Sequence, residues 1–334
     1  MKKIVNDPKN VVEEMLEGYL KAHSSYIKRL EEHPRALVLN RETKENKVGV
    51  LVGGGSGHEP GFLGYVGEGM ADGVAVGNIF ASPSPDPIIE VTKAIDKGAG
   101  VLYIYGNYAG DLMNFGMAAE MVELEDGIEV KSVIGNDDVA SAPKEEQDKR
   151  RGIAGEFFVF KAAGAAADWG LSLDEVARVA QKANDNTRSM GVGLTPCYLP
   201  QTGKPSFEIE DDEIEIGLGH HGEPGVEKTS ILTAQEISER FINDILNDYE
   251  LESGSEVAVL VNGLGSTTLM ELYIVYDEVE KILTEKGIKI YKSYVGDYIT
   301  SLEMGGCSVT LMKLDDELKK AVDHAVDCPE FVQK

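Results

Sequence analysis

Two of the six histidines in this 334-residue sequence are adjacent: His220 and His221, in the stretch GLGHHGEPG (217–225). A second stretch, LVGGGSGHEPG (51–61), repeats the outline of glycine, histidine, glutamate and proline around His58. An imidazole can serve as a nucleophile, a general base or a metal ligand, whereas an isolated surface histidine needs no function. If the histidine pair stood alone, solvent exposure would be enough to explain it. Two similar Gly-His-Glu-Pro turns in one chain make a chance occurrence of the motif improbable.

The glycine run before His58 is typical of a loop that brings backbone close to a ligand. Consecutive glycines let backbone N–H groups approach a bound molecule, and Ser56 adds a hydroxyl. The run is not the dinucleotide fingerprint, because His58 takes the place of the third glycine, and no P-loop pattern occurs in the chain. The alternative is a tight strand-to-loop turn with no ligand.

A carboxylate follows the next expected strand. VLYIYGNYAGDLMNFG (101–116) places Asp111 where that strand passes into a helix, so a helix N-cap is one interpretation. Ligands of α/β sheets gather at the C-terminal ends of strands, where His58 and Asp111 are both expected. An imidazole and a carboxylate at one sheet edge can share proton transfer on a hydroxyl group.

A metal site is the competing hypothesis. His58, Glu59, Asp111, His220 and His221 supply donors that suit zinc. Adjacent histidines rarely point the same way, however, and no H-E-x-x-H spacing occurs. We therefore predict that the chain has no metal site.

Apolar runs and longer helical patterns alternate along the chain, which predicts α/β layers. The length exceeds what one core usually serves, so we expect two α/β domains, each a β-sheet with helices packed on its faces. The Gly-, Pro- and Thr-rich segment 186–207 divides them into 1–186, with the glycine-rich loop, and 187–334, with His221. The expected strands are 48–52, 101–105, 130–134, 257–261 and 290–295. The expected helices are 7–23, 86–98, 111–124, 233–249 and 266–287. The first three of these helices begin with Asp, which is a favoured residue at a helix start.

Composition narrows the class of ligand. The net charge is −26, from 32 basic and 58 acidic residues, which argues against nucleic acid and gives no help in capturing a polyanion. No apolar run reaches the roughly 18 residues of a membrane helix, and the charged N-terminus does not read as a secretory signal. Three cysteines without a CxxC pair indicate neither a disulfide framework nor zinc. We expect a cytoplasmic protein with a small neutral ligand.

Seven motifs together resemble the K subunit of the dihydroxyacetone (glycerone) kinases over essentially the whole chain. The resemblance implies a homodimer that binds a short hydroxyketone at a sheet edge, with His221 as its covalent hemiaminal anchor. It further implies that Gly55, Ser56 and Gly57 line the substrate. The motifs are GGGSGHEP, FASPSPDPI, NYAGDLMNFGMAAE, RRGIAGEFFVFKAAGAAA, GKPSFEI, EIGLGHHGEPG and VNGLGSTTLMEL.

The same resemblance assigns the phosphorylation chemistry. His58 would be the general base for the terminal hydroxyl, and Asp111 would orient that hydroxyl or share its proton. The chain would be the substrate-binding subunit of a phosphotransferase in glycerol metabolism and would carry no cofactor. ADP or ATP with Mg²⁺ would belong to a separate nucleotide-binding kinase subunit, and a phosphoryl-donor subunit of the phosphotransferase system would recharge that nucleotide.

Two departures leave the substrate open. The family's usual Lys-Asn-Tyr is Gly106-Asn107-Tyr108 here, and the usual Ile before the anchor is His220. Because Gly106 stands where the family has a lysine, the site would have extra space. A four-carbon ketose such as erythrulose is therefore a candidate substrate besides dihydroxyacetone. A non-catalytic, ketose-sensing coactivator of transcription is the alternative from another class, although retention of His58 and Asp111 beside His221 favours the enzyme.

Overall fold

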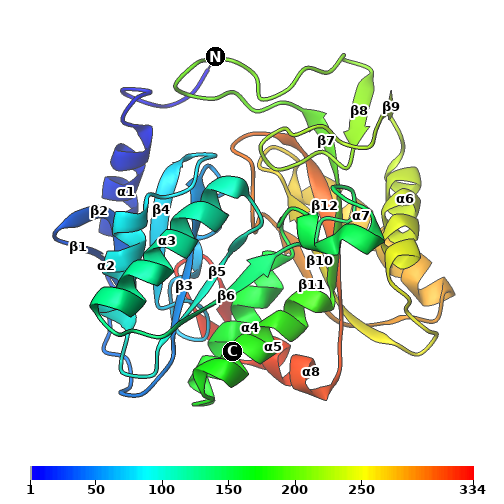
Figure 1. Ribbon diagram of the computed structural model, residues 1–334. Coiled ribbons are helices and arrows are strands. Elements are labelled where there is room, and N and C mark those ends of the chain that lie inside the picture. The colour runs from blue at the N-terminus through cyan, green and yellow to red at the C-terminus, as the bar shows by residue number, and fades with distance from the viewer. Residues whose placement is uncertain (1) are drawn as a thin grey trace.

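A six-stranded sheet forms the first half of the molecule. A computed structural model describes residues 2–334 (Figure 1). The strand order is β1-β2-β4-β3-β5-β6, in which β4, β3, β5 and β6 are parallel and the edge hairpin of β1 and β2 runs antiparallel. The strands are β1 (Ile27–Leu30), β2 (His33–Leu39), β3 (Gly49–Ser56), β4 (Gly73–Ile79), β5 (Val101–Gly106) and β6 (Val130–Gly135).

Helices cover both faces of this sheet, so its central strands are continuous apolar runs. Along β3, Leu51 packs with α2 and α3, whereas Val50 and Val52 point to the opposite face and pack with α4 and α5. Helix α1 contacts β1, and a short 3₁₀ turn covers Leu63–Tyr65. The helices are α1 (Val11–Ala22), α2 (Pro85–Ile95), α3 (Ala109–Glu125), α4 (Glu156–Asp168) and α5 (Leu173–Asp185).

A second six-stranded sheet forms the other half, in the order β11-β10-β12-β7-β8-β9, with only β10 and β11 parallel. Helices α6 and α7 pack on one of its faces. The elements are a 3₁₀ turn (Lys144–Lys149), β7 (Thr187–Thr195), β8 (Glu213–Ile216), β9 (Glu227–Ser230), α6 (Ala234–Asp248), β10 (Glu256–Gly263), α7 (Leu269–Glu285), β11 (Lys289–Gly296) and β12 (Gly305–Lys313).

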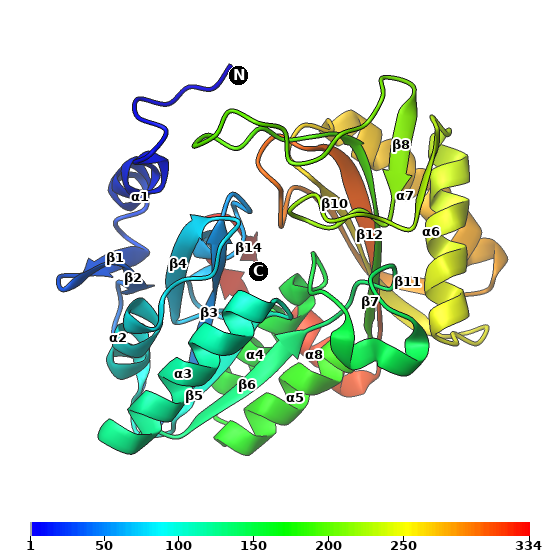
Figure 2. The same ribbon diagram turned by 45° about the horizontal axis from the view of Figure 1, so that its top comes forward.

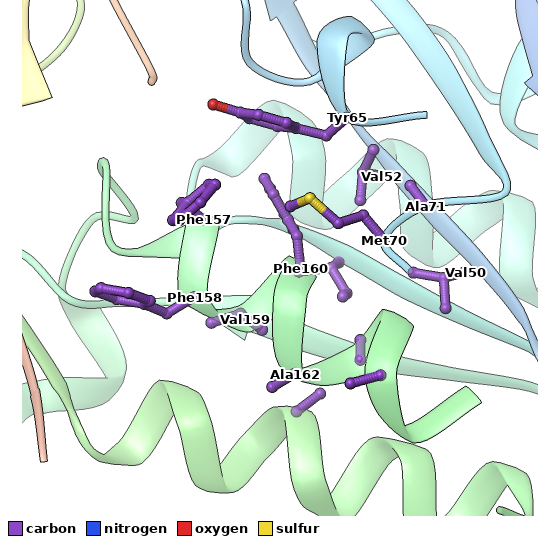
Figure 3. Packing of buried hydrophobic residues seen from close by; sticks show 14 of the residues in the cluster. Val50, Val52, Tyr65, Met70, Ala71, Phe157, Phe158, Val159, Phe160 and Ala162 are labelled. Atoms are coloured by element: carbon purple, nitrogen blue, oxygen red, sulfur yellow. The ribbon is translucent and has the colours of Figure 1, made fainter. Parts of the chain in front are cut away.

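Helix α4 joins the two halves. Its residues from Glu156 to Ala167 are all buried, and the helix lies at the junction of the halves in both views (Figure 1, Figure 2). Phe157 contacts Tyr294 of β11 with ring centroids 5.3 Å apart, and Phe160 lies beside Tyr65 of the first half (Figure 3). The largest hydrophobic cluster therefore draws residues from both sheets. The division into domains at residue 186 stays a prediction.

The C-terminal segment returns to the first half. Helix α8 (Asp316–Asp323) packs on α4, and β13 (Val326–Asp327) pairs with β14 (Val332–Gln333). An isolated bridge then links Asp327 to Glu68. No helix within residues 2–334 is both long and apolar enough to cross a membrane.

The α/β fold class predicted from the sequence is confirmed, as are the five expected strands (β3, β5, β6, β10 and β11) and the five expected helices, within a few residues. The predicted helix starts are wrong in detail. Helix α1 begins after Asn10, α2 after Ser84 with Pro85 in its first turn, and α3 after Tyr108. Asp86 and Asp111 lie inside the first turn, where a carboxylate interacts favourably with the helix dipole without capping the helix.

A buried ionic network fixes the connection between the sheets. Asp248, the last residue of α6, accepts hydrogen bonds from Arg150 (Nη1–Oδ2, 3.0 Å) and from Arg188 of β7 (Nε–Oδ2, 2.6 Å). Burial alone would raise the pKa of Asp248, but the two guanidinium groups outweigh it and lower the pKa. All three side chains are buried, so each depends on the others for compensation of its charge.

We expect Asp248→Ala to destabilise the protein by about 3–5 kcal/mol, because two buried guanidinium groups lose their counter-ion. Urea unfolding of the variant and the wild type measures the difference. The control is Asp277→Ala, which removes an exposed partner of Lys281 and should cost less than about 1 kcal/mol. Equal losses in the two variants would contradict a structural role for the network.

Candidate active site

The residues expected to do chemistry converge on one small cavity of about 30 Å³. His58 follows β3, Asp111 lies in the first turn of α3 after β5, and His221 lies in the loop between β8 and β9. The cavity thus forms where strand ends of the first sheet meet a loop of the second. It is lined by Gly53, Gly54, Gly55, His58, Phe62, Gly106, Tyr108, Asp111, Gly152, Ile153, Glu156, His220, His221 and Ile299.

Not every residue of the glycine-rich loop lines this cavity. Gly55 does, but the Ser56 hydroxyl donates to the carbonyl of Gly77 at 2.8 Å. The backbone N–H of Gly57, which has a φ of +99°, donates to the Glu59 carboxylate. The structure therefore gives Ser56 and Gly57 roles in shaping the turn, and it does not bring them to the cavity wall.

The glutamate of each Gly-His-Glu-Pro turn performs the same local task. Glu59 accepts a hydrogen bond from the backbone two residues earlier, and Glu223 likewise accepts one from the backbone N–H of His221 at 2.9 Å. The repeated sequence motif therefore corresponds to a repeated hydrogen bond between a glutamate side chain and the backbone of the turn. Glu223 was not among the residues predicted from the sequence, and the recurrence of this motif is the signal that could have identified it.

His221 is held in one tautomer by Glu223. Its Nδ1 lies 2.8 Å from Oε1 of this carboxylate. Burial alone would raise the pKa of Glu223, but its hydrogen bonds and its proximity to His221 outweigh burial and lower the pKa to about 2. An ionised carboxylate only accepts hydrogen bonds, so Nδ1 carries a proton, and in the neutral ring Nε2 therefore presents its lone pair. The side chain is partly exposed, at 23%.

His58 faces His221 across the cavity. Its Nδ1 lies 2.6 Å from the carbonyl oxygen of Thr300, an acceptor only, so this nitrogen also carries the proton. The two Nε2 atoms are 3.1 Å apart. Two lone pairs at this distance repel, so the pair either shares one proton or is separated by a ligand. Burial, and then the proximity of His221, lowers the pKa of His58 to about 3.

His220 lies beside the other two rings. Its centroid is 5.6 Å from that of His58, and its Nε2 is enclosed without a hydrogen-bond partner. Burial, followed by the two neighbouring imidazoles, lowers its pKa well below the ordinary value, so the ring is neutral. Both adjacent histidines thus face the cavity, and solvent exposure does not explain this pair.

Asp111 completes the set of proton-transfer groups. It is buried, and its Oδ1 is enclosed without a partner. Burial raises the pKa of Asp111 to about 6, although hydrogen bonding to Ser82 and the nearby His221 counteract part of the rise. A carboxyl group with such a pKa changes its protonation state close to neutral pH, which suits a general base.

The described part of the chain contains no set of side chains that could bind a metal ion. No group of three or more His, Cys, Asp or Glu side chains within residues 2–334 is arranged to hold a metal ion. His58 and His221 are instead engaged with each other, with the Thr300 carbonyl and with Glu223.

The fold and the site define a two-sheet α/β protein whose imidazole-lined cavity opens where both sheets meet. The chain belongs to the Dak1 domain family, whose model matches residues 17–330. This confirms the resemblance found in the motifs.

A relative from Listeria innocua, the dihydroxyacetone-binding subunit DhaK of a PTS-dependent dihydroxyacetone kinase 2, is 50% identical over 99% of both chains. A D-erythrulose kinase from Mycolicibacterium smegmatis is 44% identical over 99% of this chain and 56% of its own. The solved structure of a dihydroxyacetone kinase operon co-activator, DhaQ, superposes with a TM-score of 0.89 at 32% identity, covering 96% of this chain and 98% of its own.

We expect Glu223→Ala to release the tautomer of His221, because the substitution removes the acceptor of the Nδ1 proton. Nitrogen-15 NMR of the imidazole rings should show Nδ1-protonated His221 in the wild type and a mixture with the Nε2-protonated form in the variant. His58 is the internal control, since its Nδ1 partner is the unaltered Thr300 carbonyl. An unchanged His221 spectrum would show that Glu223 does not set the tautomer.

Proposed function

We propose that this chain is the ketose-binding subunit of a dihydroxyacetone kinase. The observation that carries the proposal is the oriented Nε2 lone pair of His221 in a cavity that also encloses unpartnered polar atoms of Asp111, Glu156 and His220. Buried polar atoms are normally hydrogen-bonded, so this wall suits a small ligand rich in hydroxyl groups. The 50% identity to a dihydroxyacetone-binding subunit over both full lengths supports the same conclusion.

Covalent capture follows from the tautomer of His221. Nε2 adds to the carbonyl carbon of the ketose, the C=O π bond opens, and the oxygen takes up one proton from solvent to become the hydroxyl of a hemiaminal, which solvent reaches because His221 is partly exposed. Nδ1 keeps its proton, and the positive charge that develops on the ring is balanced by Glu223. A three-carbon ketose offers few atoms for non-covalent binding, and polyols such as glycerol have no carbonyl carbon to attack.

Asp111 is the better match for the general base. A group whose pKa burial raises to about 6 is ionised and still basic near neutral pH, whereas a histidine with a pKa of about 3 accepts protons poorly. We therefore assign removal of the hydroxyl proton to Asp111. His58, which the sequence analysis expected to be the base, offers its Nε2 as a hydrogen-bond acceptor that orients the hydroxyl.

The phosphoryl donor in this proposal is a nucleotide held by a separate kinase subunit, with ADP or ATP and Mg²⁺ bound there. The name of the Listeria relative, a binding subunit within a PTS-dependent kinase, supports this division of labour. A homodimer and a cytoplasmic location stay predictions of the sequence analysis.

Two alternatives to a dihydroxyacetone kinase are included in the experiments below, one a different substrate and one a different function. The M. smegmatis relative is a D-erythrulose kinase, which makes a four-carbon ketose the second candidate substrate. The DhaQ structure belongs to an operon co-activator, which makes ketose sensing the second candidate function. Adduct formation without phosphoryl transfer in the presence of a nucleotide-binding subunit would favour the sensor.

We expect wild-type protein incubated with dihydroxyacetone to gain the mass of one ketose in intact-protein mass spectrometry, and His221→Ala to gain none. The reason is that the Nδ1 proton of His221 is held by Glu223 and its side chain is partly exposed, whereas His58 and His220 are buried. Erythrulose and glycerol are measured in parallel to fix the chain length and the need for a carbonyl. Adduct formation by His221→Ala would overturn the anchor role.

We expect phosphoryl transfer, assayed with the nucleotide-carrying subunit, to fall as the pH drops through about 6, because Asp111 acts only as the carboxylate. Asp111→Asn should lose roughly 10²-fold or more of the rate, lose this acidic limb, and still form the adduct. A variant that keeps the same acidic limb would show that another group is the base.

A further inference from the structure

Glu156 is a buried acid in the cavity wall that the mechanism above does not use. It is the first residue of α4, is 3% exposed, and its Oε2 is enclosed without a hydrogen-bond partner. Within residues 2–334 no basic side chain forms an ion pair with it, and Arg151, five residues earlier in the chain, binds Asp138. A buried carboxyl group without a partner is costly, so its retention points to a partner that arrives with the ligand.

Three glycines make room for this carboxyl group. A Cβ atom at Gly106, Gly135 or Gly152 would lie 2.8, 2.6 or 2.1 Å from Oε1 of Glu156, closer than any real contact. Gly106 and Gly152 belong to the cavity wall themselves. The backbone is thus shaped around the head of this side chain, which lies in the same cavity wall as His221 and Asp111.

The surroundings of Glu156 favour its protonated form. Burial, followed by the negative charges of Asp137 and Asp111, raises its pKa well above the ordinary value. Asp137 is itself occupied by the backbone N–H groups of Ile153 and Gly155, each at 2.9 Å, so it offers Glu156 no compensation. A neutral carboxylic acid carries one O–H donor, whereas Asp111 and the Nε2 atoms of His58 and His221 act as acceptors.

We propose that Glu156, as a carboxylic acid, donates a hydrogen bond to the ketose hydroxyl that is not phosphorylated and thereby selects ketones hydroxylated on both sides of the carbonyl. This inference rests on the proposed function. The outer hydroxyl meets Asp111 and His58, the carbonyl carbon meets His221, and the inner hydroxyl meets Glu156. Glu156 is a specificity-determining residue in this arrangement, since it touches the end of the substrate that does not react.

The test compares dihydroxyacetone with hydroxyacetone, which lacks one of the two hydroxyl groups. A site built to hydrogen-bond a hydroxyl rejects the analogue without it, because the buried partner is then left unpaired. The dissociation constant of the covalent adduct is measured for both ketones with the wild type, Glu156→Leu and Glu156→Gln. Leucine removes the donor at similar size, and glutamine is the matched control because its amide keeps an N–H donor.

We expect the wild type to prefer dihydroxyacetone about tenfold or more, the effect of one buried hydrogen bond. Glu156→Leu should lose this preference, binding dihydroxyacetone about tenfold more weakly and hydroxyacetone as well as the wild type does. Glu156→Gln should keep the preference. Equal weakening of both ketones in Glu156→Leu, or loss of the preference in Glu156→Gln, would overturn the proposal.

A second measurement stands even where the leucine variant does not fold. Infrared difference spectra on adding dihydroxyacetone should show a shift of a protonated carboxyl C=O band in the wild type and no such band in Glu156→Gln. The same band in Glu156→Gln would assign it to another acid and contradict the donor role. A wild type that forms no adduct with either ketone would instead refute the proposed function, so the two failures are distinct.

Discussion

The burial of α4 on every side is the constraint on which the rest of the structure depends. A helix with no exposed face needs packing partners on all sides, and neither sheet can supply them alone. The first sheet covers one side through β3 and β5, and Tyr294 of the second sheet covers another. Because both sheets pack against α4, the end of β3 and the loop before β9 meet at the N-terminus of this helix, where the cavity lies.

The cavity wall carries little net charge despite its many titratable groups. Burial keeps His58 and His220 neutral and favours the protonated form of Glu156. Glu223, which is strongly ionised, is paired with His221, so Asp111 is the carboxylate that faces the cavity near neutral pH. Such a wall suits an uncharged ligand and disfavours a polyphosphate, in keeping with the charge of −26 on the whole chain.

The sequence predicted the central strands and the principal site residues because both leave local signals. Val50 to Val52 and Val257 to Val261 are apolar runs of strand length, and the Gly-His-Glu-Pro turns mark His58 and His221. It did not predict β9, whose residues Glu227 to Ser230 are polar and lie at a sheet edge, nor that Asp111 lies within a helix turn instead of capping it.

Other contributions to the site leave no trace in the sequence. The Thr300 carbonyl fixes the tautomer of His58 through a backbone atom that every residue has, 242 positions away. Glu156 has the sequence features of an ordinary acid at the start of a helix, where acids are common. Only the packing of Gly106, Gly135 and Gly152 around its carboxyl group distinguishes it. Both depend on tertiary contacts that no local pattern encodes.

The 3.1 Å approach of His58 to His221 has a consequence for how such a protein can evolve. The two rings are supplied by different sheets, and the helix between those sheets is covered only when both are present. A gene fragment encoding either sheet by itself would therefore yield neither a stable core nor half of an activity. Duplication, fusion and loss should act on this unit as a whole, while new specificity arises by exchange of single side chains along the cavity wall.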